Sequence, residues 1–129
     1  MKKVIDINNI KGIRISVKSK FKRSFKKKNK ILHSFRSSIT IHNFGKSNIQ
    51  ILSNYKSILD PFRKENTLLK FSSKPLLKPG KKIKIYLDHF LKSKAAKVNG
   101  YFSMISLDNS KKFKAYIPSI RLTHPEILN

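Results

Sequence analysis

The stretch that decides the fold reads FRSSITIHNFG from Phe35 to Gly45 and is followed by IQILS from Ile49 to Ser53. Along the first stretch Phe35, Ile39 and Ile41 share one parity, and polar side chains occupy most of the other positions. Apolar and polar residues that alternate with a period of two are typical of a strand that buries one face. A short loop around Gly45 separates the two stretches, as in a hairpin connection. We therefore predict two antiparallel strands here.

The same alternation recurs along the rest of the chain, at residues 13–18, 83–88, 101–105 and 112–117, with a weaker strand expected within Thr67–Leu77. Turn sequences separate these segments, so we predict an all-β fold, an antiparallel sandwich of about seven strands. A small barrel is the alternative, because periodicity does not report closure. The residues expected to face one shared core are Ile15, Ile39, Ile41, Ile51, Ile85, Phe102, Met104, Phe113 and Ile117.

Composition sets the class of protein. Hydrophobic residues make up 39% of the 129 residues, enough for the core of a single domain across residues 1–129. No run approaches the about 20 apolar residues of a membrane-spanning helix, and no apolar segment follows the basic start as in a secretory signal. Cysteine is absent, which allows a reducing compartment. We expect a cytoplasmic protein.

The charge balance is extreme, with 30 Lys and Arg against six carboxylates and a formal net charge of +24. One explanation is a surface for nucleic acid or another polyanion. The other is codon drift, because Lys, Ile and Asn all have AT-rich codons and all are abundant here. Abundant Ile and Asn have no use in polyanion binding, so drift accounts for more of the pattern.

The basic residues are densest in Lys18–Lys30, between two expected strands, and we predict a long, exposed and mobile loop there. If the charge has a function, this loop binds nucleic acid weakly and without sequence preference, because lysine lacks the bidentate contacts of arginine. Phe21 and Phe25 either stack on bases or pack on the edge of the sandwich. The candidate polyanion-binding residues are Lys18, Lys20, Lys22, Arg23, Lys26, Lys27 and Lys28.

Four motifs, in order and at similar spacing, resemble the ApaG family. The opening stretch resembles its ITI-x-N-x-G and VQLLS, and Lys74–Gly80 (KPLLKPG) resembles its QP-x-L-x-PG. Gly100–Met104 (GYFSM) resembles G-x-Y-x-M, and Phe113–Leu122 (FKAYIPSIRL) resembles F-x-x-x-IP-x-F-x-L. The residues that carry the match, expected to be mainly structural, are Phe35, Ile39, Ile41, Asn43, Gly45, Gln50, Leu52, Pro75, Pro79, Gly80, Gly100, Met104, Phe113, Ile117, Pro118 and Leu122.

The resemblance implies a fibronectin type III-like or immunoglobulin-like sandwich. It also implies a binding module rather than an enzyme, because the domain is found in eukaryotic proteins as a protein-binding module. Bacterial members are linked genetically to cobalt resistance and magnesium efflux. We therefore expect protein partners, and exposed sandwich edges also permit a homodimer.

Three kinds of chemistry are not expected. Family members carry a G-x-G-x-x-G run suggested to hold a pyrophosphate, but the matching segment Thr67–Ser73 has no glycine to form such a cradle, so we expect no cofactor. The carboxylates are scattered and no G-x-S-x-G elbow is present, which argues against an enzyme. His33 and His42 differ in parity, and no His-x3-His spacing occurs, so we expect no metal site.

Overall fold

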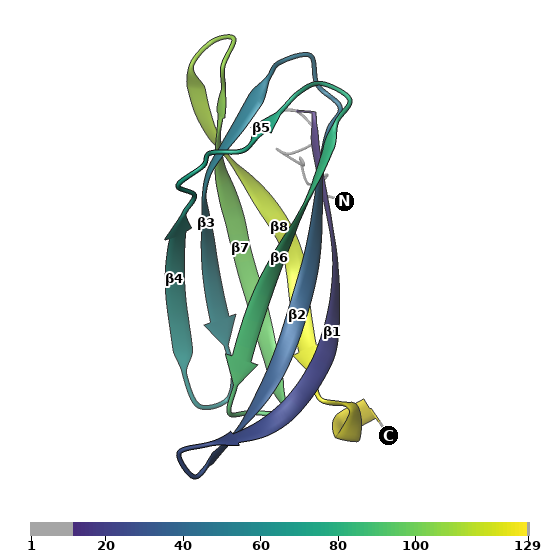
Figure 1. Ribbon diagram of the computed structural model, residues 1–129, viewed down its shortest axis with the longest axis vertical. Coiled ribbons are helices and arrows are strands. Elements are labelled where there is room, and N and C mark those ends of the chain that lie inside the picture. Colours follow the sequence, from purple (N-terminus) through teal and green to yellow (C-terminus); the bar gives the residue numbers. More distant parts are fainter. Residues whose placement is uncertain (1–11, 129) are drawn as a thin grey trace, which may run out of the picture.

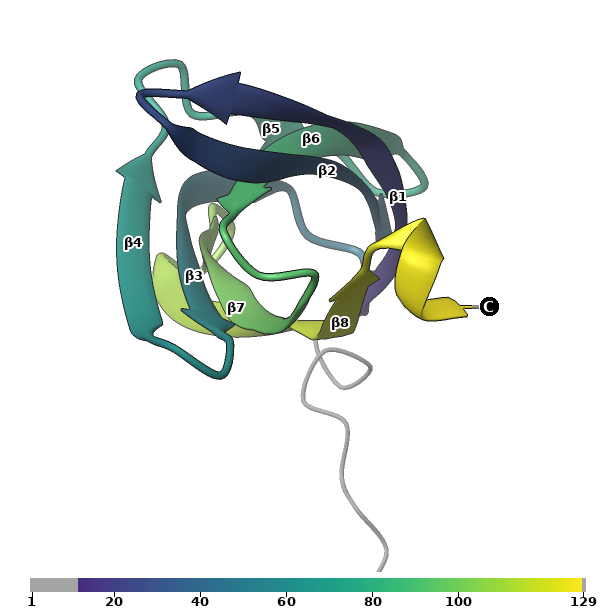
Figure 2. The same cartoon turned by 90° about the horizontal axis from the view of Figure 1, so that it is seen from below.

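Two antiparallel sheets pack face to face in the computed structural model, which describes residues 12–128 (Figures 1 and 2). One sheet has the order β1 (Ile13–Lys27), β2 (Lys30–Asn43) and β6 (Lys82–Leu91). The other has the order β4 (Lys64–Lys70), β3 (Ile49–Leu59), β7 (Ala95–Ser106) and β8 (Lys111–Thr123), with β5 (Leu76–Leu77) paired to the start of β3. A 3-10 turn, Pro125–Leu128, follows β8. The predicted antiparallel β-sandwich is confirmed, with eight strands because β5 is separate from β4.

The core lies between the two sheets and follows the predicted parity. Of the nine residues expected there, seven are buried, and Ile85 and Phe113 are partly buried against them. Phe35 on β2 and Phe102 on β7 are the largest fully buried side chains and come from opposite sheets. Apolar burial stabilises by about 25 cal/mol per Å², so this shared layer holds the sheets together. No helix within residues 12–128 is long and apolar enough to cross a membrane.

The prediction of a mobile loop at residues 18–30 is wrong. Strand β1 continues to Lys27 with an irregularity between Phe21 and Arg23, and Lys28 and Asn29, both at positive φ (49° and 63°), form a two-residue turn into β2. Two successive positive φ values belong to the type I′ turn, whose twist matches that of antiparallel strands. Charge was a misleading signal here, because an edge strand with one solvated face carries lysines without disturbing its ladder. Residues 18–30 therefore belong to a β-hairpin. We call the end of this hairpin, Phe21–Ser34, the hairpin arm.

Two further expectations need correction. The connection Asn43–Asn48 is not a hairpin loop, because β2 and β3 lie in different sheets and the loop crosses between them. The weaker strand expected within Thr67–Leu77 begins earlier, because β4 covers Lys64–Lys70 and pairs with β3 from Ser53↔Lys70 to Leu59↔Lys64. All seven residues of β4 are exposed, so it lacked the alternation that marks a half-buried strand.

The Asn43 side chain fastens the crossing loops at one end of the sandwich. It is fully buried, donates from Nδ2 to the carbonyls of Ser47 (2.8 Å) and Leu77 (3.0 Å), and accepts at Oδ1 from the Gly45 N–H (2.9 Å). The neighbouring turn has Gly80 at φ +79° and a bond from Lys81 N–H to Lys78 O (3.1 Å), which is the geometry of a type II turn with Pro79 and Gly80 at its centre. One amide thus satisfies three backbone groups that would otherwise lack partners.

Candidate functional site

A row of tyrosines crosses the outer face of the β4-β3-β7-β8 sheet. Tyr55 on β3 stands opposite Tyr101 on β7, and Tyr101 opposite Tyr116 on β8. The ring centroids of Tyr55 and Tyr101 are 5.1 Å apart and stacked, and those of Tyr101 and Tyr116 are 5.7 Å apart. Tyr116 is 50% exposed, and Leu68 of β4, opposite Tyr55, is 56% exposed. We call Tyr55, Tyr101 and Tyr116 the tyrosine row.

Short polar side chains border the tyrosine row. On one flank Ser53 of β3 pairs with Ser103 of β7, with Lys70 and Lys114 at the two ends of the same line of partners. The Lys114 ammonium lies 4.7 Å from the centre of the Tyr101 ring, a cation–π contact. The result is an aromatic strip with positive charge at its rim.

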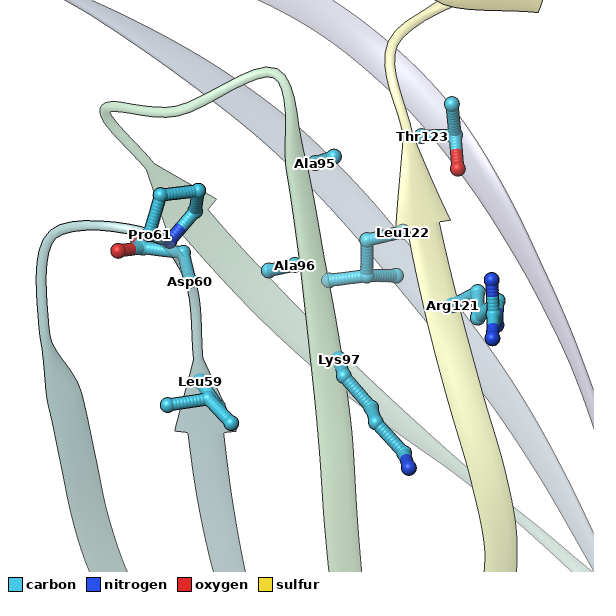
Figure 3. A pocket seen from close by; sticks show the side chains of 9 residues that line it. All are labelled: Leu59, Asp60, Pro61, Ala95, Ala96, Lys97, Arg121, Leu122 and Thr123. Carbon is cyan, nitrogen blue, oxygen red and sulfur yellow. The ribbon is translucent and has the colours of Figure 1, made fainter.

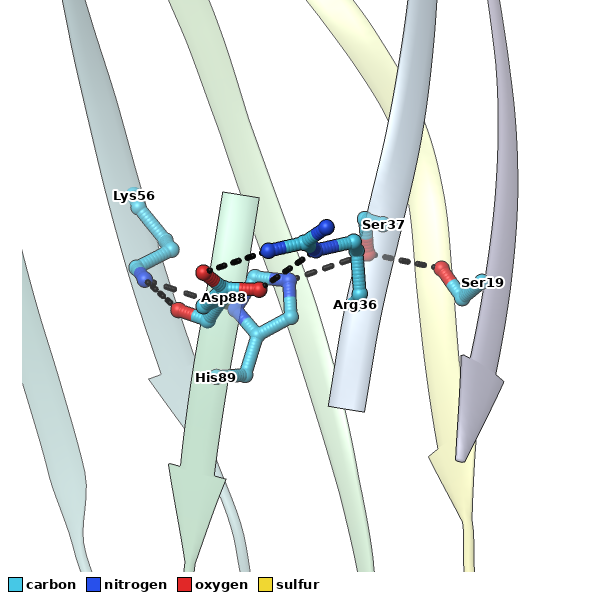
Figure 4. A network of polar contacts seen from close by, with 6 residues as sticks. All are labelled: Ser19, Arg36, Ser37, Lys56, Asp88 and His89. Atoms are coloured by element: carbon cyan, nitrogen blue, oxygen red, sulfur yellow. Dashed lines mark hydrogen bonds and ion pairs between the residues drawn. The ribbon is translucent and has the colours of Figure 1, made fainter. Parts of the chain in front are cut away.

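A chain of polar contacts crosses the sandwich and is buried at its centre (Figure 4). The Ser19 and Ser37 hydroxyls are 2.7 Å apart, and Ser37 Oγ is 2.9 Å from His89 Nε2. On its other side, His89 Nδ1 is 3.3 Å from the Lys56 ammonium. An ammonium can only donate, so Nδ1 accepts and the ring proton is on Nε2, which donates to Ser37. The chain links β1, β2, β6 and β3.

The Ser37–His89 pair is a poor catalytic pair despite its geometry. Ser37 is fully buried and His89 is 1% exposed, so neither side chain is open to solvent. Burial, followed by the charge of Lys56, lowers the pKa of His89 to about 4, which makes the imidazole a weak base near neutral pH. The neighbouring Asp88 points out of the sandwich and pairs with Arg36 at 2.8 Å, as expected for adjacent strand residues.

The Lys56 side chain opens onto a pocket of about 320 Å³ between β3, the start of β4 and the edge strand β6. The pocket includes Arg63, Glu65, Phe90 and Lys92 among its walls. Burial lowers the pKa of Lys56, which bonds the Asp88 carbonyl (3.4 Å) as well as His89. We call this the Lys56 pocket.

A larger pocket, of about 480 Å³, lies at one end of the β4-β3-β7-β8 sheet, between the β3–β4 turn, β7 and β8 (Figure 3). Its one carboxylate, Asp60, accepts from the N–H groups of Phe62 (2.8 Å) and Arg63 (2.9 Å) and from Ser93 Oγ (3.0 Å). Burial acts most strongly and raises the pKa of Asp60, but these bonds together with the Arg63 charge lower it overall. Asp60 therefore fastens two loops, and its oxygens are occupied.

The sequence-predicted polyanion residues lie along one strand and its turn. Lys18 and Lys20 stand on the outer face of the β1-β2-β6 sheet, while Lys26, Lys27 and Lys28 reach the tip of the hairpin arm. Phe21 packs against Phe35 (5.5 Å) and His124 (4.6 Å), and Phe25 against Phe90 (6.2 Å). Of the two alternatives for these rings, the structure shows packing.

The histidines are dispersed, apart from one pair that sequence reasoning did not bring together. His33 and His124 rings are 4.8 Å apart and share Ser24 Oγ, at 2.7 Å from His33 Nδ1 and 3.3 Å from His124 Nε2. Burial lowers the pKa of His33, followed by the charges of His124 and Lys94. Within residues 12–128 no group of three His, Cys, Asp or Glu side chains is placed to hold a metal ion.

The residues that matched the family motifs have mostly backbone-fastening or core positions. Gln50 donates to the Lys74 carbonyl (3.2 Å), and the Pro75 carbonyl accepts from Ile51 N–H (2.9 Å). Gly100 stands opposite Lys56 of β3, next to a bulge in the β7–β8 pairing, and a Cβ at Gly100 would lie 2.3 Å from the Tyr55 carbonyl oxygen. The tyrosine row lies beside this bulge. In the sequence, the alternation of each strand places its tyrosine on the outer face. It does not show that the three tyrosines are neighbours, because that depends on the register between strands.

The comparison of structures finds similar proteins, whereas the comparisons of sequence find none. No protein family matches the sequence, and no curated protein matches it significantly. The structure is similar to that of the structural genomics target SoR45, with a TM-score of 0.83 and 21% identity over 92% of this chain and 91% of that one. It is also similar to a Bordetella pertussis protein provisionally named ApaA, with a TM-score of 0.71 and 19% identity over 88% of this chain and 94% of that one.

At these identities the likeness concerns the fold alone. The similarity nevertheless covers nearly the whole of each chain, and it includes the sandwich that the four motifs implied. The chain has an ApaG-like fold.

Proposed function

We propose that this protein is a non-catalytic protein-binding module and that its binding surface is the outer face of the β4-β3-β7-β8 sheet. The observation that carries the proposal is the tyrosine row, with rings aligned across three strands and Tyr116 half exposed. Tyrosine is enriched at protein interfaces, because a rigid ring buries a large area and loses little conformational entropy.

The partner's chemistry follows from the rim. Lys70 and Lys114 lie along one flank of the tyrosine row, and the whole chain has a formal net charge of +24. An acidic protein surface complements this arrangement, with apolar or aromatic side chains over the rings and carboxylates over the lysines. The genetic link of ApaG proteins to cobalt and magnesium fits an accessory role in ion homeostasis exercised through such a partner.

The test compares two tyrosine changes on opposite faces. Tagged protein is used to capture partners at moderate salt after nuclease treatment, in the wild type, in Tyr101→Ser/Tyr116→Ser, and in Tyr86→Ser. Tyr86 is 54% exposed on the outer face of the other sheet, which makes it a matched control. We expect the double change to abolish capture of a protein that Tyr86→Ser still captures. Equal capture by all three proteins, or loss of all partners after nuclease, contradicts the proposal.

The hairpin arm supports a second candidate, weak polyanion binding. The specific observation is that its basic residues lie on a paired two-stranded ribbon, which is already ordered before a nucleic acid arrives. We expect binding of a single-stranded oligonucleotide that moderate salt removes and that shows no sequence preference. Titration at two salt concentrations, with Lys26, Lys27 and Lys28 changed to Gln, checks this. Tight, sequence-selective binding that depends on Phe21 and Phe25 would make this the leading function.

A further inference from the structure

The Lys56 pocket collects cationic groups from three different segments. Lys56 comes from β3, Arg63 from the turn before β4, and Lys92 from the turn that follows β6. Lys92 in turn contacts Lys30 of the hairpin arm, and this like-charge contact is the main cause of its lowered pKa. Cations that repel one another around a cavity create a local excess of positive potential.

The carboxylates of the pocket form their salt bridges with other cations, and their charges raise the pKa of Lys56 by less than burial lowers it. Glu65 pairs with Arg63 at 2.6 Å, and Asp88 pairs with Arg36 through two bonds of 2.8 and 3.3 Å (Figure 4). Among the described residues, neither Lys56 nor Lys92 forms a salt bridge. After these pairings the pocket retains two positive charges.

Lys56 also has bonding capacity left. An ammonium has three N–H donors, and the two contacts of Lys56, with His89 and the Asp88 carbonyl, are long at 3.3 and 3.4 Å. Partial burial of an ammonium without a carboxylate is unfavourable, so a position of this kind gains most from an added anion. The pocket's remaining walls include Leu32 and the half-exposed Phe90, which are apolar.

We propose that the Lys56 pocket binds a phosphate-class dianion, with Lys56 and Lys92 as its charged ligands. Two unpaired amines match a charge of −2, and a volume of about 320 Å³ holds a phosphate group together with a small substituent. The site is built from side chains on β3 and on the turn after β6, not from a glycine-rich backbone loop. It lies on the edge of the sandwich and is independent of the tyrosine row.

The experiment is an amide NMR titration with inorganic phosphate and, separately, with phenyl phosphate, at pH 7.5 and constant ionic strength. The variants are Lys56→Met, Lys92→Met and Lys84→Met. Lys92 is exposed, so its change keeps the test valid if Lys56→Met fails to fold. Lys84, exposed on the outer face of β6, is the matched control.

We expect saturable amide shifts at Ile58, His89 and Phe90. The affinity derived from them should fall at least about tenfold in Lys56→Met and severalfold in Lys92→Met, and should be unchanged in Lys84→Met. Tighter binding of phenyl phosphate assigns the site to a phosphate monoester packed on Phe90, and equal or weaker binding assigns it to inorganic phosphate. Shifts that do not saturate, or that Lys84→Met reduces as much as Lys92→Met does, overturn the proposal.

Discussion

At the scale of single residues, glycines show how sequence motifs correspond to different physical constraints. Gly100 is required by space, because the Tyr55 carbonyl oxygen occupies the position of a Cβ. Gly80 is required by conformation, because its φ is +79° while nothing lies within 4 Å of the added atom. The two constraints have different energetic consequences.

We expect Gly100→Ala to lower the free energy of unfolding by at least about 2 kcal/mol, because β3 and β7 must separate locally. Gly80→Ala should lower it by only about 1 kcal/mol, the cost of a left-handed conformation for a residue with a Cβ. Urea unfolding of both variants checks the difference. Equal losses would contradict the close approach at Tyr55.

His89 makes folding stability depend on pH. Its pKa is about 4 in the folded protein, against 6.5 for an ordinary histidine. Between these two values the histidine is protonated in the unfolded chain and neutral in the folded protein. The stabilisation is complete above pH 6.5 and is lost as the pH falls toward 4, on the order of 3 kcal/mol for a fully buried group. Protonation would also break the acceptor contact with Lys56.

Unfolding free energies at pH 7 and pH 4.5 test this dependence. His89→Gln should flatten the decrease relative to the wild type, with His42→Gln, at a partly buried position, as the control. If the decrease persists in full in His89→Gln, other groups control the acid sensitivity.

At the scale of elements, the hairpin arm depends on its turn. Lys28 and Asn29 both have positive φ, which Asn-Gly adopts with less strain. The double change Lys28→Asn/Asn29→Gly should therefore raise the free energy of unfolding by about 1 kcal/mol.

A second variant, Lys28→Ala/Asn29→Ala, should have the opposite effect and lower the free energy of unfolding by a similar amount, because alanine tolerates positive φ less well than asparagine does. Thermal or urea unfolding of the two variants measures both effects. A mobile loop would respond to neither change, so identical stability in all three proteins would argue against the paired arm.

At the scale of the whole molecule, the distribution of charge separates drift from function. Lys18 and Lys84 lie on the outer face of one sheet, and Lys70 and Lys114 on that of the other. A polyanion site would require the cations to gather where one backbone can reach them together. The spread over both faces agrees with codon drift for most lysines, and the hairpin arm and the Lys56 pocket are the local concentrations.

The dispersed histidines give a whole-molecule prediction for metal ions. Micromolar Co²⁺ or Mg²⁺ should leave the melting temperature unchanged, since a ligand at 100 times its dissociation constant would add about 2.7 kcal/mol of stability. Differential scanning fluorimetry with and without the ions checks this. An increase abolished by His33→Ala, at the His33–His124 pair, or by His89→Ala would contradict it.

The sequence by itself determined the properties that repeat locally along the chain. Alternation at Ile39 and Ile41 determined which face is buried, and Pro79–Gly80 determined a turn, because both depend on nearest neighbours. The same local logic failed at β4, whose two faces are both exposed, and at Lys18–Lys30, where charge concealed a strand.

Only the tertiary structure decided which distant residues meet. Tyr55, Tyr101 and Tyr116 form a row because strand register and the bulge at Gly100 align them, and register is a property of paired strands. Lys56 and Lys92 share a pocket because two sheets pack face to face, and His89 has its low pKa because that packing excludes water. Local pattern specifies the strands, whereas candidate sites arise from their pairing and burial.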